Sequence, residues 1–237
     1  MHSHIPLAFL GLAFLASLAL PSEAEATVII NGTRVVMDGN KNEAVITVHN
    51  PDEAVYLVQS WVEKKPGDTQ KTPFFVTPPL SRIDPGKINT LRIILTEKSL
   101  PDSKESLFWL NIKAIPSLPS SGGEEPDQLI FIVKNVLKVI YRPASLWGKD
   151  TERNPEKLEW IYKNEFIEVK NPTPFVVSFN KIAVDGQEVD DISYILPFSS
   201  SRIKLRKNKR PNMLTFSTVN DYGGESATYT QKIIQLP

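Results

Sequence analysis

The segment LIFIVKNVLKVIYRP, residues 129–143, predicts one long β-strand that ends at a proline. Its apolar residues fall on both alternating sets of positions, which is typical of a strand that is buried on both faces. The same segment carries three cations, Lys134, Lys138 and Arg142. Such a strand needs a packing partner for each face, and its cations need a structural or functional role.

Shorter strands precede this segment, separated by turn sequences rich in Gly, Pro, Asn and Asp. Together with the segment they make seven strands in about a hundred residues, a pattern typical of an immunoglobulin-like sandwich. The TPPL sequence at residues 77–80 predicts a rigid corner with a cis-proline. The expected strands are residues 27–37, 43–50, 56–65, 73–79, 89–95 and 106–115.

Two polar stretches interrupt the strand pattern. Residues 116–127, PSLPSSGGEEPD, predict a loop before the long strand, and residues 142–155 predict a hinge between two domains. Further strands are expected at residues 158–163, 166–171, 175–186, 192–198, 201–206, 213–221 and 227–236. The sequence therefore predicts an all-β protein of two immunoglobulin-like β-sandwich domains, residues 27–143 and 144–237.

The first 26 residues have the features of a secretory signal peptide. Residues 7–20 are an apolar run too short to span a bilayer comfortably, and the A-x-A pattern Ala24-Glu25-Ala26 follows. Cleavage is expected after Ala26, although the leader has no Lys or Arg. An N-terminal membrane anchor is the alternative. No other segment is a transmembrane candidate.

Composition excludes several classes of function. The chain has no cysteine, which excludes disulfide scaffolds, zinc-thiolate sites and thiol enzymes. His49 is the one histidine outside the expected signal peptide, so we expect no bound metal and no cofactor. Without the leader the chain has 27 basic and 25 acidic residues, too balanced for a nucleic-acid or membrane-surface partner. The one basic run, residues 204–210, lacks interleaved aromatic residues.

The most specific motif is LPDSKESLFWLNIKAIP, residues 100–116. It is similar to the signature of the PapD-like periplasmic pilus (fimbrial) assembly chaperones, in which Leu-Pro-x-Asp leads to Arg-Glu-Ser-Leu-Phe, then Asn and Ile-Pro. Lys104 stands where the family usually has Arg. Further matches follow the family order: GTRVVM, QSWVE, FFVTPPLSRIDPG, VIYRP, KNPTPF and NDYGG. The resemblance covers nearly the whole mature chain and implies two immunoglobulin-like domains in a boomerang arrangement with a cleft between them.

This resemblance implies a periplasmic chaperone that binds, folds and caps pilus subunits and delivers them to an outer-membrane usher. A pilus subunit is an incomplete sandwich, and the chaperone completes it with its own edge strand, which is donor-strand complementation. By the resemblance, the donated side chains are Leu129, Phe131 and Val133. We then expect one face of the long strand to belong to the protein's own core and the other to the client.

The resemblance also assigns the cations. Arg34 and Lys138 match a pair that binds the C-terminal carboxylate of the subunit through charge-assisted hydrogen bonds. Such an anchor fixes the register of the donated strand, because a slip of one residue reverses every side chain. Lys138 has the parity of Ile130 and Ile132, so the sequence leaves open whether a bend or bulge turns it toward the donated side chains.

A second ionic set, Glu105, Arg142 and Asp221, matches a family network at the domain interface. Arg142 is its expected centre, since a guanidinium can hold two carboxylates. Such a network is a poor source of net stability but can fix the angle between domains.

A long apolar edge invites self-association, so the free chaperone is expected to cap itself as a homodimer. The short loop without cysteine resembles the short-loop subfamily, which serves rod-shaped pili.

Two other classes of function stay open beside the chaperone. Glycosidase chemistry needs two carboxylates in a cleft, and no pair of acids is marked by its spacing, so we expect no catalytic residues. A polymerising pilus subunit or adhesin usually carries its own donor extension and often a disulfide, and this chain has two complete-looking sandwiches without cysteine.

Overall fold

The computed structural model describes residues 28–117, 131–149, 154–163, 165–205 and 210–235. The expected signal peptide and Leu129 lie outside these residues. The described chain is built of β-strands with two short 3₁₀ helices, η1 (Ala144–Leu146) and η2 (Asn154–Lys157), at the junction of its two halves. None of its helices is long and apolar enough to cross a membrane. The predicted all-β fold is therefore confirmed.

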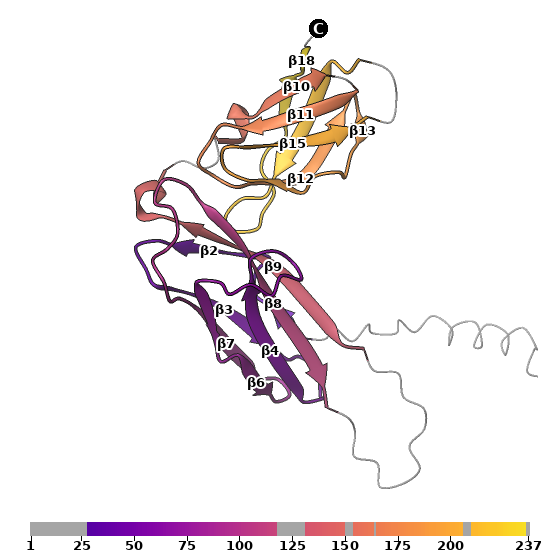
Figure 1. The fold of residues 1–237 in the computed structure, drawn as a ribbon. Helices are drawn as coiled ribbons and strands as arrows, with labels where there is room; N and C mark the ends of the chain where they lie inside the picture. The colour runs from indigo at the N-terminus through magenta and orange to yellow at the C-terminus, as the bar shows by residue number, and fades with distance from the viewer. Residues whose placement is uncertain (1–27, 118–130, 150–153, 164, 206–209, 236–237) are drawn as a thin grey trace, which may run out of the picture.

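The first half is a sandwich of two sheets, with strand orders β1-β3-β7-β5 and β2-β9-β8-β4-β6 (Figure 1). Alternate residues of facing strands meet between the sheets, so that Val58, Leu91 and Leu110 are fully buried. The strands are β1 (Ile29–Ile30), β2 (Arg34–Asp38), β3 (Glu43–His49), β4 (Tyr56–Glu63), β5 (Phe74–Thr77), β6 (Leu80–Ile83), β7 (Ile88–Leu95), β8 (Ser106–Pro116) and β9 (Val133–Arg142).

Two places in this sandwich differ from the sequence prediction. The opening stretch is two strands, because the chain turns at Gly32, whose positive φ of 132° favours glycine. This turn lets β1 pair with β3 in one sheet and β2 pair with β9 in the other. Residues 80–83, which lie in no expected strand, form β6, and the cis peptide bond predicted in the corner of residues 77–80 is present at Thr77–Pro78.

The second half is another sandwich, with strand orders β15-β11-β10-β18 and β13-β12-β16-β17 and with β14 paired to β12. Its core holds the packed rings of Trp160, Phe179 and Phe216. The strands are β10 (Glu159–Lys163), β11 (Phe166–Asn171), β12 (Val177–Val184), β13 (Gln187–Glu188), β14 (Tyr194–Ile195), β15 (Ser199–Lys204), β16 (Met213–Thr218), β17 (Tyr229–Lys232) and β18 (Ile234–Gln235).

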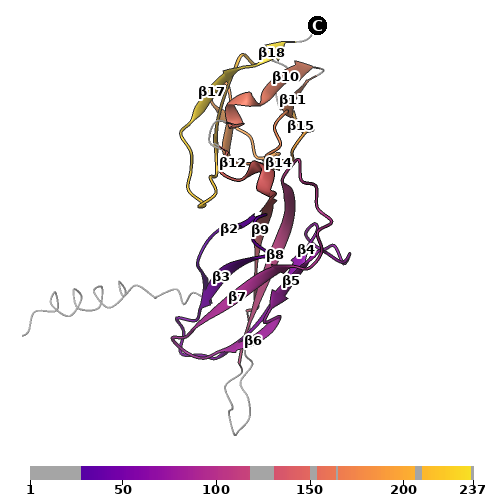
Figure 2. The same cartoon turned by 90° about the vertical axis from the view of Figure 1, so that its left-hand side faces the viewer.

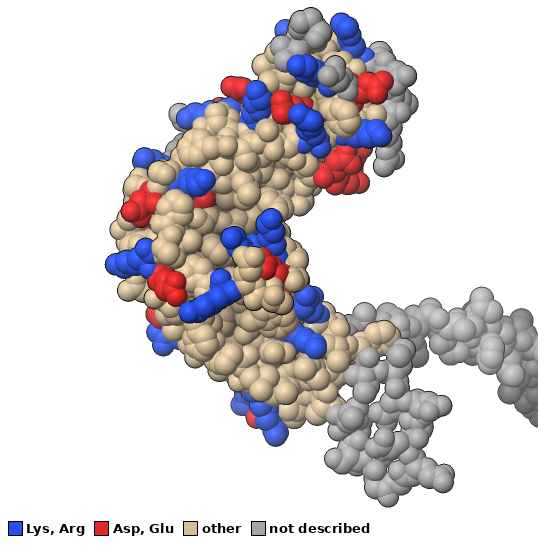
Figure 3. Space-filling view, in the orientation of Figure 1, with Lys and Arg blue, Asp and Glu red and all other residues tan. Residues whose placement is uncertain are grey.

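The two sandwiches are joined end to end at an angle, as the two views of the ribbon show (Figures 1 and 2). In the space-filling view the molecule is a curved body hollowed on one side between the domains (Figure 3). This is the boomerang arrangement that the resemblance implied, and β9 leads from the body of the first domain to the junction.

Candidate binding site at the edge of β9

The edge of β9 is vacant along half of its length. β9 pairs with β8 from Val133 to Tyr141, but on its other side β2 pairs only with residues 138–142. No described strand pairs with the second edge of residues 133–137. A row of unpaired backbone donors and acceptors is a template for an added strand.

Apolar side chains accompany this vacant edge. Phe131, just before β9, is 69% exposed, and Ile132 and Val136 are also exposed. Exposed apolar groups along one strand indicate a surface that another chain covers.

Burial in β9 increases along the strand toward its C-terminal end and also alternates between its two faces. Leu137 and Val139 are buried in the domain core. The pairing with β8 continues without a register shift to Val133, so Val133 points to the same face as Leu137. Val133, one of the side chains expected to be donated, thus lies on the face that holds the core residues. The side chains on this face are buried in the C-terminal half of β9 and become partly exposed toward Val133. The expectation that one face belongs to the core and the other to a client stays a prediction.

Lys138 lies on the opposite face of β9 from Val133, since no bulge interrupts the strand. Its ammonium is 5.8 Å from the ring centre of Trp109, its cross-strand partner, and 5.2 Å from that of Tyr194 in the second domain. The two rings meet edge to face at 5.7 Å. Cation–π contacts with aromatic rings from both domains thus hold the ammonium at the domain junction.

Arg34 is the register partner of Lys138 in the parallel pair of β2 and β9, so two cations lie side by side. Burial and the charge of Arg34 lower the pKa of Lys138 to about 8. Burial also lowers the pKa of Arg34, and Asp221 opposes that shift. Neither cation forms an ion pair with a described residue. Two partly desolvated cations with no ion-pair partner in the described part of the chain are suited to bind an anion.

Arg34 also faces a cavity of about 290 Å³ at the domain junction. Its Nη1 donates a hydrogen bond of 3.2 Å to the carbonyl oxygen of Val219, while its buried Nε has no partner among the described residues. The buried hydroxyl of Ser178, which also lines the cavity, has no partner either. Buried polar groups left unpaired are costly, so these atoms are suited to bind a polar ligand or water.

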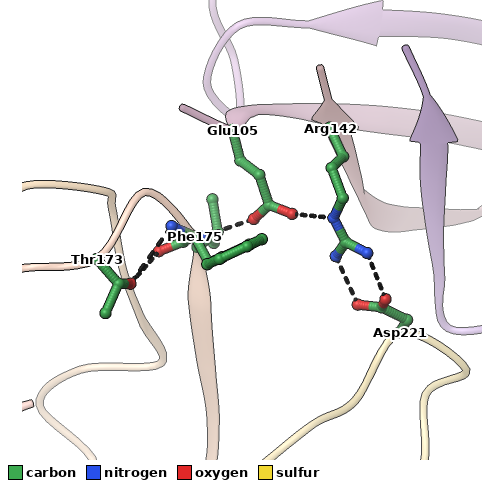
Figure 4. Close-up of polar contacts among 6 residues, drawn as sticks. Glu105, Arg142, Thr173, Phe175 and Asp221 are labelled. Atoms are coloured by element: carbon green, nitrogen blue, oxygen red, sulfur yellow. Dashed lines mark hydrogen bonds and ion pairs between the residues drawn. The ribbon is translucent and has the colours of Figure 1, made fainter. Parts of the chain in front are cut away.

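Glu105, Arg142 and Asp221 meet at the junction, as Figure 4 shows. Arg142 donates Nε to Glu105 at 2.6 Å and its two terminal nitrogens to Asp221 at 2.7 and 2.9 Å. The second oxygen of Glu105 accepts the amide of Val176 at 2.7 Å. Burial lowers the pKa of Arg142, but its carboxylate partners outweigh this and hold it above its ordinary value.

The network joins the domains directly, because Glu105 and Arg142 belong to the first domain and Val176 and Asp221 to the second. The guanidinium also lies 5.7 Å from the ring centres of Trp147 and Phe175. These two cation–π contacts and the hydrogen bonds to both carboxylates leave Arg142 little freedom to change partners.

Sequence reasoning missed Trp109, Tyr194 and Ser178. Trp109 stands in the SLFWLN motif and could be placed beside Lys138 only once the register of β8 with β9 is known. Tyr194 and Ser178 belong to the second domain, and nothing in their local sequence indicates that they lie at the site.

Two sandwiches, a vacant strand edge and a cation pair at its end are features suited to binding another protein chain. Residues 27–147 match the N-terminal domain of PapD, described as a pili and flagellar-assembly chaperone, and residues 153–230 match the C-terminal domain of the pili assembly chaperone PapD. The chain belongs to the PapD family of pilus-assembly chaperones.

Individual proteins agree with this family. The probable fimbrial chaperone LpfB of Escherichia coli O157:H7 is 35% identical over 206 residues, which cover 86% of this chain and 88% of LpfB. The chaperone protein FimC of Escherichia coli K12 is 35% identical over 215 residues, covering 90% and 87%.

Solved structures of chaperones share the fold. A chain in the complex of the Salmonella enterica SafA pilin with the SafB chaperone aligns with a TM-score of 0.78 and 28% identity, covering 87% of this chain and 96% of that one. The Escherichia coli chaperone DraB aligns with a TM-score of 0.76 and 31% identity, covering 86% and 97%.

Proposed function

We propose that this chaperone completes the fold of pilus subunits in the periplasm by lending them β9, and then delivers them to an outer-membrane usher. The observation that carries the proposal is a vacant strand edge, residues 133–137, that ends at the cation pair Arg34–Lys138. Leu129, Phe131 and Val133 are the donated side chains.

The cation pair sets the direction of the client strand. A strand added beside residues 133–137 occupies the position that β2 takes beside residues 138–142. If its terminal carboxylate stops at Lys138, the strand must run parallel to β9, as β2 does. Backbone hydrogen bonds then supply affinity that does not depend on the client's sequence, and side-chain pockets supply specificity.

Burial of the donated apolar side chains is expected to contribute substantially to the free energy of client binding. Each donated side chain contributes about 1.5–3 kcal/mol when fully buried, before the cost of association is subtracted. The carboxylate anchor adds charge-assisted hydrogen bonds and fixes which donated side chain meets which pocket. The SafB chaperone, which shares this fold, has been solved with a pilin bound.

The remaining assignments belong to the same proposal. A signal peptide cleaved after Ala26 exports the chain, and the domains comprise residues 27–143 and 144–237. The exposed apolar edge of β9 caps itself in a homodimer when no client is bound. The network of Glu105, Arg142 and Asp221 fixes the domain angle. The protein works as a chaperone without catalytic residues, cofactor or metal.

An affinity pull-down of the tagged protein from its host's periplasm tests the proposal. Wild type is compared with Lys138→Ala, Phe131→Glu and, as a control on the same strand, Lys134→Ala, because Lys134 is exposed and lies outside the anchor. A small secreted subunit that binds wild type and the control but neither of the other variants supports the proposal. The same partners with all four proteins, or none with any, would contradict it.

A further inference from the structure

Tyr222 is the most exposed large apolar or aromatic side chain of the described residues, at 96%. It lies in the NDYGG motif, residues 220–224, in the segment between β16 and β17. Asp221, the residue before it, belongs to the ionic network, but that network leaves the tyrosine ring without a role.

The turn that carries Tyr222 is held firmly by its own hydrogen bonds. The side-chain oxygen of Asn220 accepts the amides of Tyr222 at 3.0 Å and Gly224 at 2.9 Å. The backbone of Asn220 exchanges two further bonds with the turn: its amide donates to the carbonyl of Gly224 at 2.8 Å, and its carbonyl accepts the amide of Gly223 at 3.1 Å. Asp221 is fixed by its paired bonds to Arg142. The ring therefore projects from a rigid base.

The turn lies beside the proposed anchor. A Cβ built on Gly223 would come within 2.3 Å of the Thr33 hydroxyl, so the turn touches the residue just before Arg34. Val219, on the other side of the turn, accepts the hydrogen bond from Arg34. β2 starts at Arg34, opposite Lys138, so Thr33 stands at the end of β2 that borders the vacant stretch of β9.

We propose that Tyr222 packs against the client subunit, on the residues that immediately precede its C-terminal carboxylate. This inference rests on the proposed function, because it places the client strand beside residues 133–137. Such a strand runs toward Arg34 and ends where the turn touches Thr33. Tyr222 is then a contact of the second domain with a client held mainly by the first.

The physical form of the residue suits this role. Tyrosine supplies a large, amphipathic contact area with few rotatable bonds, so little conformational entropy is lost on binding. A rigid turn lowers the ordering cost further. The turn is held by backbone groups and by Asn220 and Asp221, none of which involve the ring, so removal of the ring leaves the fold intact.

Affinity measurements test the inference on the full mature chain. The probe is a fluorescent synthetic peptide that ends in the C-terminus of the subunit identified by the pull-down, with a free carboxylate. We expect Tyr222→Ala to weaken binding about tenfold, the loss typical of an interface tyrosine, and Tyr222→Phe to weaken it less. Phe75→Ala is the matched control, because Phe75 is an exposed aromatic residue on β5 of the other sheet. It should bind as wild type does.

Lys138→Ala separates this inference from the proposed function. If Lys138→Ala loses binding while Tyr222→Ala binds as wild type, the client contact of Tyr222 is refuted and the proposed function stands. If neither variant differs from wild type, or if the pull-down yields no subunit, both fail. A lower melting temperature of Tyr222→Ala would also count against the inference, because it would give the ring a structural role.

Photo-cross-linking identifies the neighbour of residue 222 directly. Tyr222→p-benzoylphenylalanine is irradiated in the purified complex of the chaperone with its subunit. A cross-link to the last residues of the subunit supports the inference. A cross-link only to a second chaperone copy, only elsewhere on the subunit, or none at all overturns it.

Discussion

Binding of a C-terminal carboxylate is expected to weaken as the pH rises above about 8. The pKa of Lys138 in the free protein is about 8, because burial and the neighbouring Arg34 both disfavour its charge. A carboxylate binds the charged form, so the bound state holds the proton to a higher pH. The affinity for the client carboxylate is then nearly constant well below pH 8. Above pH 8 it falls by up to tenfold per pH unit, so the total loss between pH 7 and pH 9 is about tenfold.

The pH dependence of stability should have the opposite sign. The pKa of Lys138 in the folded protein lies below the ordinary lysine pKa of 10.5 that applies to an unfolded chain, so the unfolded state binds more protons between pH 8 and 10.5. Stability from this group therefore rises with pH in that window. Client affinity falls over the same window, and a general alkaline loss of structure cannot produce both trends.

Fluorescence anisotropy of the subunit peptide at constant ionic strength, from pH 6.5 to 10, measures the effect. Lys138→Arg keeps the charge throughout this range and should bind with little dependence on pH. Tyr194→Phe removes the hydroxyl but keeps the ring that contacts the ammonium, and should leave the profile in place. A C-terminally amidated peptide should bind weakly at every pH. A flat wild-type profile, or the same decline in Lys138→Arg, would refute the role of Lys138 as a titrating anchor.

Other substitutions test the remaining parts of the molecule. Arg142→Ala leaves the Glu105 carboxylate buried without its cation, so it should lower the stability by about 3–5 kcal/mol and broaden the distribution of domain angles, measured by chemical denaturation and small-angle scattering; wild-type melting with loss of client binding alone would contradict this. Phe131→Ser should leave the melting temperature unchanged, since its side chain is 69% exposed, whereas Leu137→Ala in the core should cost about 2–5 kcal/mol; equal losses would refute the division of β9 along its length. Gly223→Ala should displace the turn from Thr33 and cost about 1–2 kcal/mol, because its φ is 86° and its Cβ would meet the Thr33 hydroxyl; an unchanged melting curve and peptide affinity would show that the contact is unimportant.

The alternation of apolar residues predicted the fold class, because period-2 patterns and turn sequences are local signals. It did not predict where a strand leaves the core. Val133 and Leu137 have the same parity and chemistry, yet only Leu137 is buried. The difference depends on how far the rest of the domain extends along β9, which is a property of the whole sandwich.

The binding site was harder to predict from the sequence than the fold. Arg34 and Lys138 were chosen by resemblance. No local pattern distinguishes them from the exposed Lys134, which lies four residues before Lys138 on the same strand. Their pairing depends on the parallel register of β2 with β9, which joins residues about a hundred positions apart. Burial and Arg34 lower the pKa of Lys138, and Tyr194 contacts its ammonium from the second domain, so the state of this lysine is a tertiary property of the folded chain.

The charges at the junction suggest why the ionic network and the anchor lie so close together. Arg34 and Lys138 repel each other, and Asp221 raises the pKa of Arg34 in opposition to burial. The network holds two carboxylates, Glu105 and Asp221, against one guanidinium, so it carries a net charge of −1. It thereby offsets one of the two anchor cations and leaves the junction at +1. One client carboxylate then neutralises the junction, and a client with an amidated C-terminus leaves a partly buried positive charge uncompensated.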